Sequence, residues 1–165
     1  MFRKILVPYD NSKPADNAIK HAAELAKSIV GDTEIILLQV VPNLPASPLL
    51  LERPVKTRKG EILPLSEYIK QLYQEMQINA TEGLEKKKKE IEQDLGSSSN
   101  KVTIRVLVLL GDSVSDSIVE FAEKEKADLI IIGNIGLTGF SKLKTLGSVS
   151  RAVSERSSCP VLIVH

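Results

Sequence analysis

Glycine and serine residues in the last quarter of the sequence could bind phosphate. Gly133 and Gly136 follow a wholly apolar run, and Gly147 and Ser148 precede a short segment with helical spacing. Glycine has no Cβ, so its backbone N–H can come close to a ligand. The first N–H groups of a helix have no partner within the helix, and the helix dipole favours negative charge there. The pattern therefore predicts an anion site made of main-chain amides between a strand and a helix.

A carboxylate, Asp10, follows the first apolar run, residues 5–8. In open α/β sheets ligands bind beyond the carboxyl ends of the strands, which is where Asp10 is expected to lie. Asp, Asn and Ser are also common helix caps, so Asp10 could instead cap the helix expected to begin near Pro14. Spacing alone leaves both interpretations open.

Length and composition limit the fold and the partners. We expect a single domain over residues 1–165, because this length suits one well-filled core. The net charge of +1 disfavours a general nucleic-acid or membrane binder, and no apolar run approaches the roughly 20 residues needed to span a bilayer. One cysteine and two histidines allow no intrachain disulfide and no familiar zinc cluster. A start that lacks a signal-peptide pattern favours a cytoplasmic protein.

Apolar runs alternate with segments of helical spacing along most of the chain. We expect strands at residues 5–8, 34–41, 102–110, 129–132 and 161–164, with helices between them. Runs without polar alternation are typical of strands buried on both faces of a parallel sheet. The sequence therefore predicts a doubly wound α/β fold, with a five-stranded parallel sheet and helices on both faces.

Two segments depart from this alternation. Residues 42–64 contain five prolines, so we expect neither a long helix nor a central strand there. The segment is either a variable, mobile surface excursion or a part that folds over a ligand or a partner. A long helix is then predicted from Ser66, and we expect it to bend or fray at Gly83. Its predicted apolar face consists of Ile69, Leu72, Met76, Ala80, Leu84, Ile91 and Leu95.

The motifs resemble the universal stress protein (UspA-like) family, in particular its ATP-binding branch. The matching segments are Gly133-x2-Gly136, Gly147-Ser148 and Cys159-Pro160-Val161-Leu162-Ile163-Val164. Residues 4–12, the second predicted strand and the region of Gly111 match as well, so the resemblance covers nearly the whole chain. It implies the adenine nucleotide alpha hydrolase-like fold with strand order 3-2-1-4-5. In that order Asp10 and the Gly133 loop face the same crevice.

The resemblance also implies a site for ATP, with or without Mg²⁺. Asp10 and the backbone of Val40 would hold adenine and ribose, and the glycine loop with the following helix would surround the phosphates. Lys142 or Lys144 could reach a terminal phosphate. The cofactor-binding residues that it implies are Pro8, Tyr9, Asp10, Val40, Gly133, Gly136, Gly147, Ser148, Val149 and Ser150.

We assign no catalytic residue and no metal ligand. Efficient phosphoryl transfer needs positioned Mg²⁺, a group that orients water and cationic charge, whereas the loop has no second carboxylate and no histidine. Together with these absences, the resemblance implies a nucleotide-responsive binding and signalling module of the stress response, with slow or no hydrolysis.

The alternative is a dimeric stress or interaction protein that binds no nucleotide and whose glycine loop is only structural. Ten residues separate Gly136 from Gly147 where the family pattern has nine, and Ile135 stands where a polar residue is frequent. Both departures favour this alternative. Members of the family pair their final strands, so the resemblance implies a homodimer through Val161–Val164 under either hypothesis.

Overall fold

The computed structural model describes residues 2–96, 101–136 and 146–165. Its main sheet contains five parallel strands, β1 (Lys4–Pro8), β2 (Thr33–Pro42), β5 (Val102–Gly111), β6 (Leu129–Gly133) and β7 (Val161–Val164). Their order is β5-β2-β1-β6-β7, which is the predicted order 3-2-1-4-5. Ile5 pairs with Leu129, so β1 and β6 are neighbours where the strand order reverses. The predicted doubly wound parallel sheet is confirmed.

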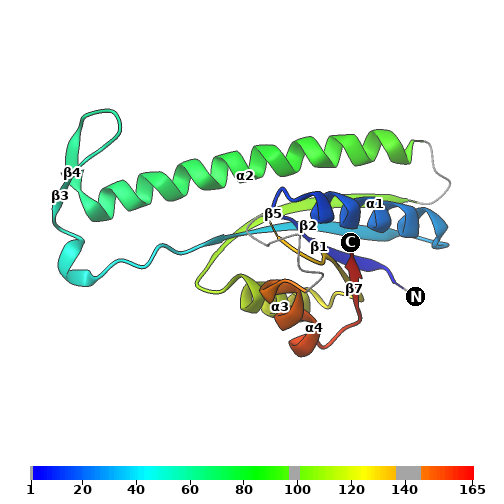
Figure 1. Ribbon diagram of the computed structural model, residues 1–165. Coiled ribbons are helices and arrows are strands. Elements are labelled where there is room, and N and C mark those ends of the chain that lie inside the picture. Colours follow the sequence, from blue (N-terminus) through cyan, green and yellow to red (C-terminus); the bar gives the residue numbers. More distant parts are fainter. Residues whose placement is uncertain (1, 97–100, 137–145) are drawn as a thin grey trace.

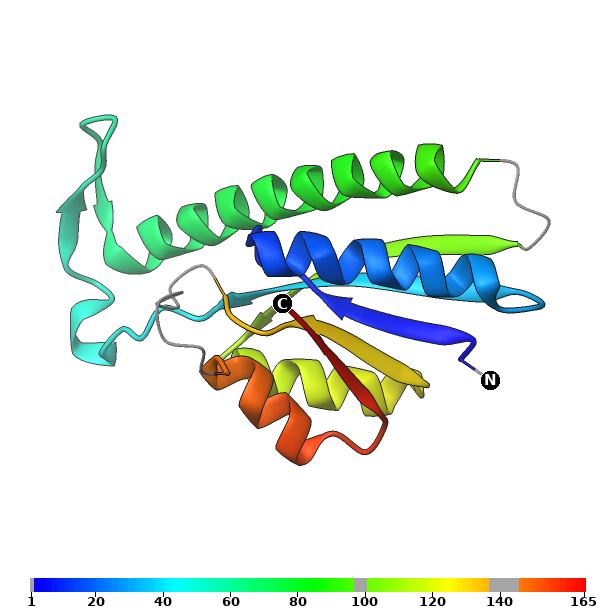
Figure 2. The same ribbon diagram turned by 45° about the vertical axis from the view of Figure 1, so that its right-hand side comes forward.

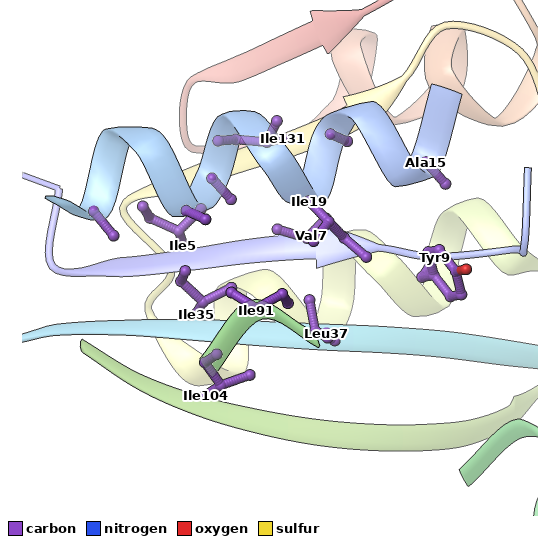
Figure 3. Packing of buried hydrophobic residues seen from close by; sticks show 14 of the residues in the cluster. Ile5, Val7, Tyr9, Ala15, Ile19, Ile35, Leu37, Ile91, Ile104 and Ile131 are labelled. Atoms are coloured by element: carbon purple, nitrogen blue, oxygen red, sulfur yellow. The ribbon is translucent and has the colours of Figure 1, made fainter. Parts of the chain in front are cut away.

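Helices cover both faces of this sheet (Figure 1). One face carries α1 (Lys13–Ser28) and α2 (Leu65–Leu95), and the other carries α3 (Val114–Glu125) and α4 (Ser148–Arg156). Successive strand residues point to opposite faces. Ile5 and Val7 therefore belong to the core under α1 and α2 (Figure 3), whereas Leu6 belongs to the core under α3 and α4. Within the described ranges, no helix combines the length and the apolarity needed to cross a membrane.

Serine caps fix where two of these helices begin. The Ser12 hydroxyl accepts the N–H of Ala15 at 3.2 Å, and Pro14 stands in the first turn of α1. The Ser113 hydroxyl accepts the N–H of Asp116 at 3.3 Å and caps α3. Such caps satisfy N–H groups that have no partner inside the helix. Because α1 follows β1 and α3 follows β5, both helix starts lie at the carboxyl edge of the sheet.

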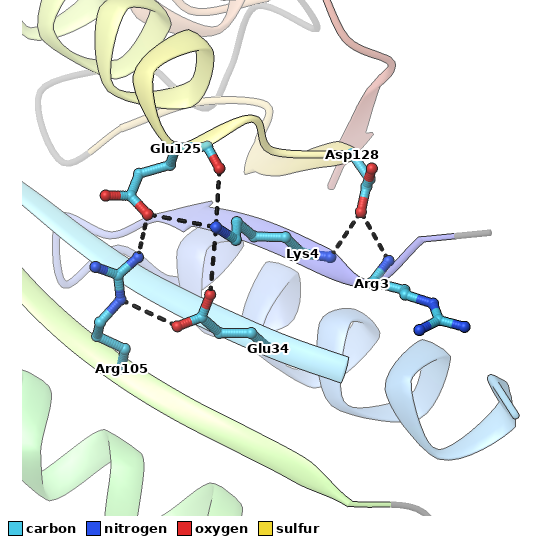
Figure 4. Close-up of polar contacts among 6 residues, drawn as sticks. All are labelled: Arg3, Lys4, Glu34, Arg105, Glu125 and Asp128. Atoms are coloured by element: carbon cyan, nitrogen blue, oxygen red, sulfur yellow. Dashed lines mark hydrogen bonds and ion pairs between the residues drawn. The ribbon is translucent and has the colours of Figure 1, made fainter. Parts of the chain in front are cut away.

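The opposite, amino edge of the sheet is held by an ion-pair network (Figure 4). Lys4 lies 3.8 Å from Glu34 and 3.5 Å from Glu125, and Arg105 contacts both carboxylates. The Arg105 guanidinium holds the pKa of Glu125 below its usual value. Asp128 accepts the backbone N–H of Lys4 at 2.8 Å. The network links β1, β2 and β5 to the end of α3, away from the carboxyl edge.

Helix α2 differs from its prediction in two respects. It continues as one helix through Gly83, so it does not fray there. Burial of Ala80 and Leu84 on the sheet offsets the cost of about 1 kcal/mol for a helical glycine. The predicted apolar face is covered only in its second half, because Met76 is 38% exposed and the buried residues begin at Ala80.

A small antiparallel hairpin precedes α2 and was not predicted. The chain leaves β2, forms a short 3₁₀ turn, η1 (Pro48–Leu50), and then pairs β3 (Pro54–Lys56) with β4 (Ile62–Pro64). The N–H of Leu65 donates to the carbonyl of Arg53 at 2.9 Å, which joins the hairpin to the start of α2. Figures 1 and 2 show the hairpin and the first half of α2 projecting beyond the main sheet.

Candidate functional site

A cavity of about 410 Å³ lies at the carboxyl edge of the sheet. The ends of β1, β2 and β6 and the first turns of α1, α3 and α4 surround it. All ten residues of the predicted cofactor-binding set line this cavity. Sequence reasoning missed its other lining residues, which are Ser12, Ala15, Leu38, Pro42, Val114, Ile118, Ile132 and Ile135.

Most of the missed residues form an apolar part of the cavity. Pro42 comes from the end of β2, beside the predicted Val40, Val114 and Ile118 come from the start of α3, and Ile132 comes from β6. Apolar walls of this kind suit a flat, largely apolar ring system. The available sequence signal was positional, since each of these residues falls near the end of a strand or the beginning of a helix at the carboxyl edge.

Asp10 lies in a tight turn directed towards the glycine loop. Its Oδ1 accepts the N–H of Ser12 at 3.0 Å, and Ser12, not Asp10, caps α1. Asn11 has a φ of +64°, a left-handed conformation that glycine and asparagine adopt most readily. A Cβ on Gly136 would lie 2.7 Å from Asp10 Oδ2. The glycine at 136 therefore leaves room for the carboxylate, and the two sides of the crevice meet there.

Gly133 is a glycine for a different reason from the one predicted. A Cβ at this position would lie 2.8 Å from the carbonyl carbon of Pro14 and 3.0 Å from the amide nitrogen of Ala15. The first turn of α1 thus packs directly on the end of β6. The carbonyl of Gly133 also accepts the Ser150 hydroxyl at 2.7 Å in a buried position. Gly133 lines the cavity, but close helix packing is what requires a glycine.

The start of α4 supplies hydrogen-bond donors to the cavity. Gly147 donates its N–H to the carbonyl of Asn134 at 2.8 Å, so this amide is already used, contrary to the role predicted for it. Ser148 and Val149 are the first two residues of α4, and no side chain caps this helix. No acceptor for their N–H groups occurs among the residues that the structure describes. Such amides, together with the positive end of the helix dipole, have the chemistry to bind an anion.

Tyr9 connects the cavity to the helices behind it. Its ring is 5% exposed, and its hydroxyl donates to Asp16 at 3.1 Å. Burial, followed by the interaction with Asp16, raises the pKa of Tyr9 to about 12. Lys87 of α2 lies 3.1 Å from the same carboxylate. The hydroxyl is thus engaged by Asp16, and through this carboxylate Tyr9 is connected to both α1 and α2.

Lys142 and Lys144 lie outside the described residues, as does the part of the loop that carries the additional residue between Gly136 and Gly147.

Comparison with known proteins gives matches over the whole length of the chain. The universal stress protein family matches residues 1–165. Universal stress protein MJ0531 of Methanocaldococcus jannaschii is 35% identical over 164 residues, which cover 99% of this chain and 82% of the relative. The solved structure of MJ0577, from the same organism, has a TM-score of 0.75 at 29% identity and covers 99% of this chain and 96% of its own.

A more distant solved structure is a universal stress protein in complex with cAMP. Its TM-score is 0.59 at 22% identity, over 99% of this chain and 97% of its own. At this identity the likeness concerns the fold alone. The family match over the full length, together with the relative at 35% identity, establishes membership. The chain belongs to the universal stress protein family.

Proposed function

We propose that this chain binds an adenine nucleotide, ATP with or without Mg²⁺, in the cavity at the carboxyl edge. The observation that carries the proposal is the combination of three features around one cavity: apolar walls, the Asp10 carboxylate, and the N–H groups at the start of α4. The apolar walls suit adenine, the carboxylate suits the ribose hydroxyls, and the N–H groups suit the phosphates. Solved structures of other universal stress proteins with this fold include complexes with cAMP, AMP and dAMP.

Each part of the nucleotide has a partner of matching chemistry. The base packs between Val40, Pro42 and Val114, and the ribose hydroxyls donate to Asp10, whose other oxygen is fixed by the N–H of Ser12. The phosphates accept hydrogen bonds from Ser148 and Val149 at the positive end of the α4 dipole. Charge-assisted hydrogen bonds at both ends orient the nucleotide.

The same geometry favours binding and signalling over rapid turnover. Among the described residues that line the cavity, Asp10 alone has a carboxylate, and this carboxylate accepts the N–H of Ser12. We infer a nucleotide-responsive module whose output passes through Tyr9, Asp16 and Lys87 to α2. Hydrolysis, measured as phosphate release with Mg²⁺, should be slow or absent over hours.

The decisive experiment removes one N–H without disturbing the helix. Proline is favoured at the first position of a helix and lacks an N–H, and the preceding residue, Gly147, already has the extended backbone that proline requires (φ −62°, ψ 156°). Calorimetric titration of Ser148→Pro should show ATP binding weakened by about tenfold or more. Adenosine, which has no phosphate, should bind as it does to the wild type.

Ser148→Ala is the matched control, because it removes the hydroxyl and keeps the N–H. It should bind ATP within about twofold of the wild type if the amide is the donor. Equal ATP affinity of Ser148→Pro and Ser148→Ala would contradict the assignment of this amide to the phosphates.

The second candidate function is a dimeric interaction protein that binds no nucleotide. It is favoured by the internal uses of two glycines, since Gly133 packs on α1 and Gly147 donates to Asn134. This function predicts no thermal shift with ATP, ADP, AMP or cyclic AMP at millimolar concentration. The nucleotide function predicts stabilisation of about 2.7 kcal/mol at a ligand concentration 100-fold above Kd.

We also propose a homodimer through the final strand. β7 pairs with β6 on one side, and Leu162 in its centre is 43% exposed. An edge strand with an exposed apolar residue is a surface that a second strand can pair with. Leu162→Asp should abolish this contact, and sedimentation equilibrium of the variant would measure it.

A further inference from the structure

We propose that residues 48–82, here called the arm, form a second self-association surface that binds the arm of another copy of this chain in antiparallel orientation. The arm consists of η1, the β3–β4 hairpin and the first part of α2. It lies apart from the nucleotide cavity and from β7. The inference therefore does not depend on the proposed function.

The arm is an ordered projection with its own hydrogen bonds. Thr57 donates its N–H to Glu61 at 2.8 Å and closes the hairpin, and Ser66 donates to the carbonyl of Leu51 at 2.9 Å. Figures 1 and 2 show the arm extending beyond the main sheet in both views. A projection with a fixed shape can present a defined surface to a partner.

Exposed apolar side chains are concentrated on this projection. Nine large apolar residues are exposed in the part of the chain that the structure describes, and five of them lie on the arm. They are Leu49 (89%), Leu50 (38%), Ile62 (74%), Met76 (38%) and Ile78 (57%). Because the arm is about a fifth of the chain, this share is well above an even distribution. Clustered apolar exposure marks a surface that another macromolecule covers.

A groove beside the arm can receive apolar side chains. It has a volume of about 530 Å³ and lies between α2 and β5. The α2 side is mixed, with Gln77, Ile78, Thr81 and Glu82, and the β5 side is apolar, with Val106, Leu107 and Val108. β5 is an edge strand that pairs with β2, and no other described strand pairs with it. Ile78, which is 57% exposed, is the exposed apolar residue of α2 that lines this groove.

The distribution of charge on the arm indicates that the partner is a second copy. Residues 52–61, at the hairpin end, carry four basic and two acidic side chains. The helical part, residues 65–82, carries three acidic side chains and one basic one. In an antiparallel pair of arms, related by a twofold axis, each basic hairpin faces the acidic helix of the other copy. An unrelated partner would not need this internal complementarity.

The first test measures the mass of the assembly by sedimentation equilibrium in low salt, for the wild type and for single variants. The wild type should have the mass of at least two 18.1 kDa chains, and Ile78→Asp should halve the mass of the assembly. Val30→Asp is the matched control, because Val30 is 76% exposed and follows the end of α1, outside the arm. It should leave the mass unchanged.

Leu162→Asp separates the arm from the final strand. β5 and β7 are at opposite edges of the sheet, so the arm contact should persist in this variant. A wild type of single-chain mass, an Ile78→Asp variant that keeps the wild-type mass, or a Leu162→Asp variant that is already monomeric would each overturn the proposal.

The second test examines the orientation through charge. One variant reverses the charge of the hairpin, with Arg53, Lys56, Arg58 and Lys59 replaced by Glu. Another reverses the charge of the helical part, with Glu67, Glu75 and Glu82 replaced by Lys. Each alone should dissociate with a Kd at least tenfold above the wild type, whereas an equimolar mixture should form a heterodimer. Because these pairs are exposed, 0.5 M salt should weaken the heterodimer. A mixture that stays dissociated would overturn the antiparallel arrangement.

Discussion

The packing of Gly133 against α1 gives a sharp prediction for Gly133→Ala. The added Cβ would lie 2.8 Å from the carbonyl carbon and the Cβ of Pro14, and 3.0 Å from the nitrogen of Ala15. These atoms belong to the backbone and to a rigid ring, so they cannot rotate away, and α1 must shift. Overpacking of this kind costs about 1–3 kcal/mol. For a chain of this length that corresponds to a melting temperature about 2–12 °C lower.

Gly83→Ala is the matched control, because nothing lies within 4 Å of its added Cβ and the site is inside α2. Alanine at this position should stabilise the protein by about 0.5–1 kcal/mol. The opposite signs of the two changes, read by calorimetry on nucleotide-free protein, are the test. If Gly133→Ala melts at the wild-type temperature or above, the packing explanation is wrong. If the variant is also unable to bind ATP, the glycine serves the ligand instead.

Three further changes test the local structure of the site. Asn11→Ala should cost about 1 kcal/mol in urea denaturation, because Asn11 has a left-handed backbone, whereas Asn11→Gly should change stability by only a few tenths. Asp10→Asn keeps an oxygen that can accept the N–H of Ser12, and its ATP affinity, by calorimetry, should fall about tenfold; equal affinity would remove Asp10 from the ribose. The folded state holds the Tyr9 proton more tightly than the unfolded chain, whose pKa is 10.0, so this contribution to stability is complete below pH 10 and is lost as the pH rises to about 12. Tyr9→Phe should flatten that part of the profile of stability against pH, and an unchanged profile would contradict the role given to Tyr9.

The parts of this structure that follow from local sequence patterns were predicted. The parts that depend on contacts between residues far apart in the sequence were not. Unbroken apolar runs are sufficient to identify buried parallel strands, and strand ends place Asp10 and Gly133 at one edge. The order of the strands came from the family resemblance. The packing of Gly133 on Pro14 joins residues that are far apart in the sequence, so no local pattern reveals it.

The hairpin and the apolar part of the cavity escaped prediction for related reasons. β3 and β4 have three residues each, too few for a recognisable period, and Pro54 and Pro64 obscure them further. They are ordered by contacts with the start of α2. Val114 and Ile118 have the spacing of an ordinary core-facing helix, and only the position of α3 directs them into the cavity.

The unbroken length of α2 has a mechanical consequence. The helix is about 46 Å long, its second half is buried on the sheet, and its first half extends outward. A rod held at one end amplifies small rotations at the other. A tilt of about 5° at the held end displaces the far end, about 25 Å away, by about 2 Å. Lys87 contacts Asp16 within the held half, so a slight adjustment of α1 becomes a displacement of atomic size at the outer tip.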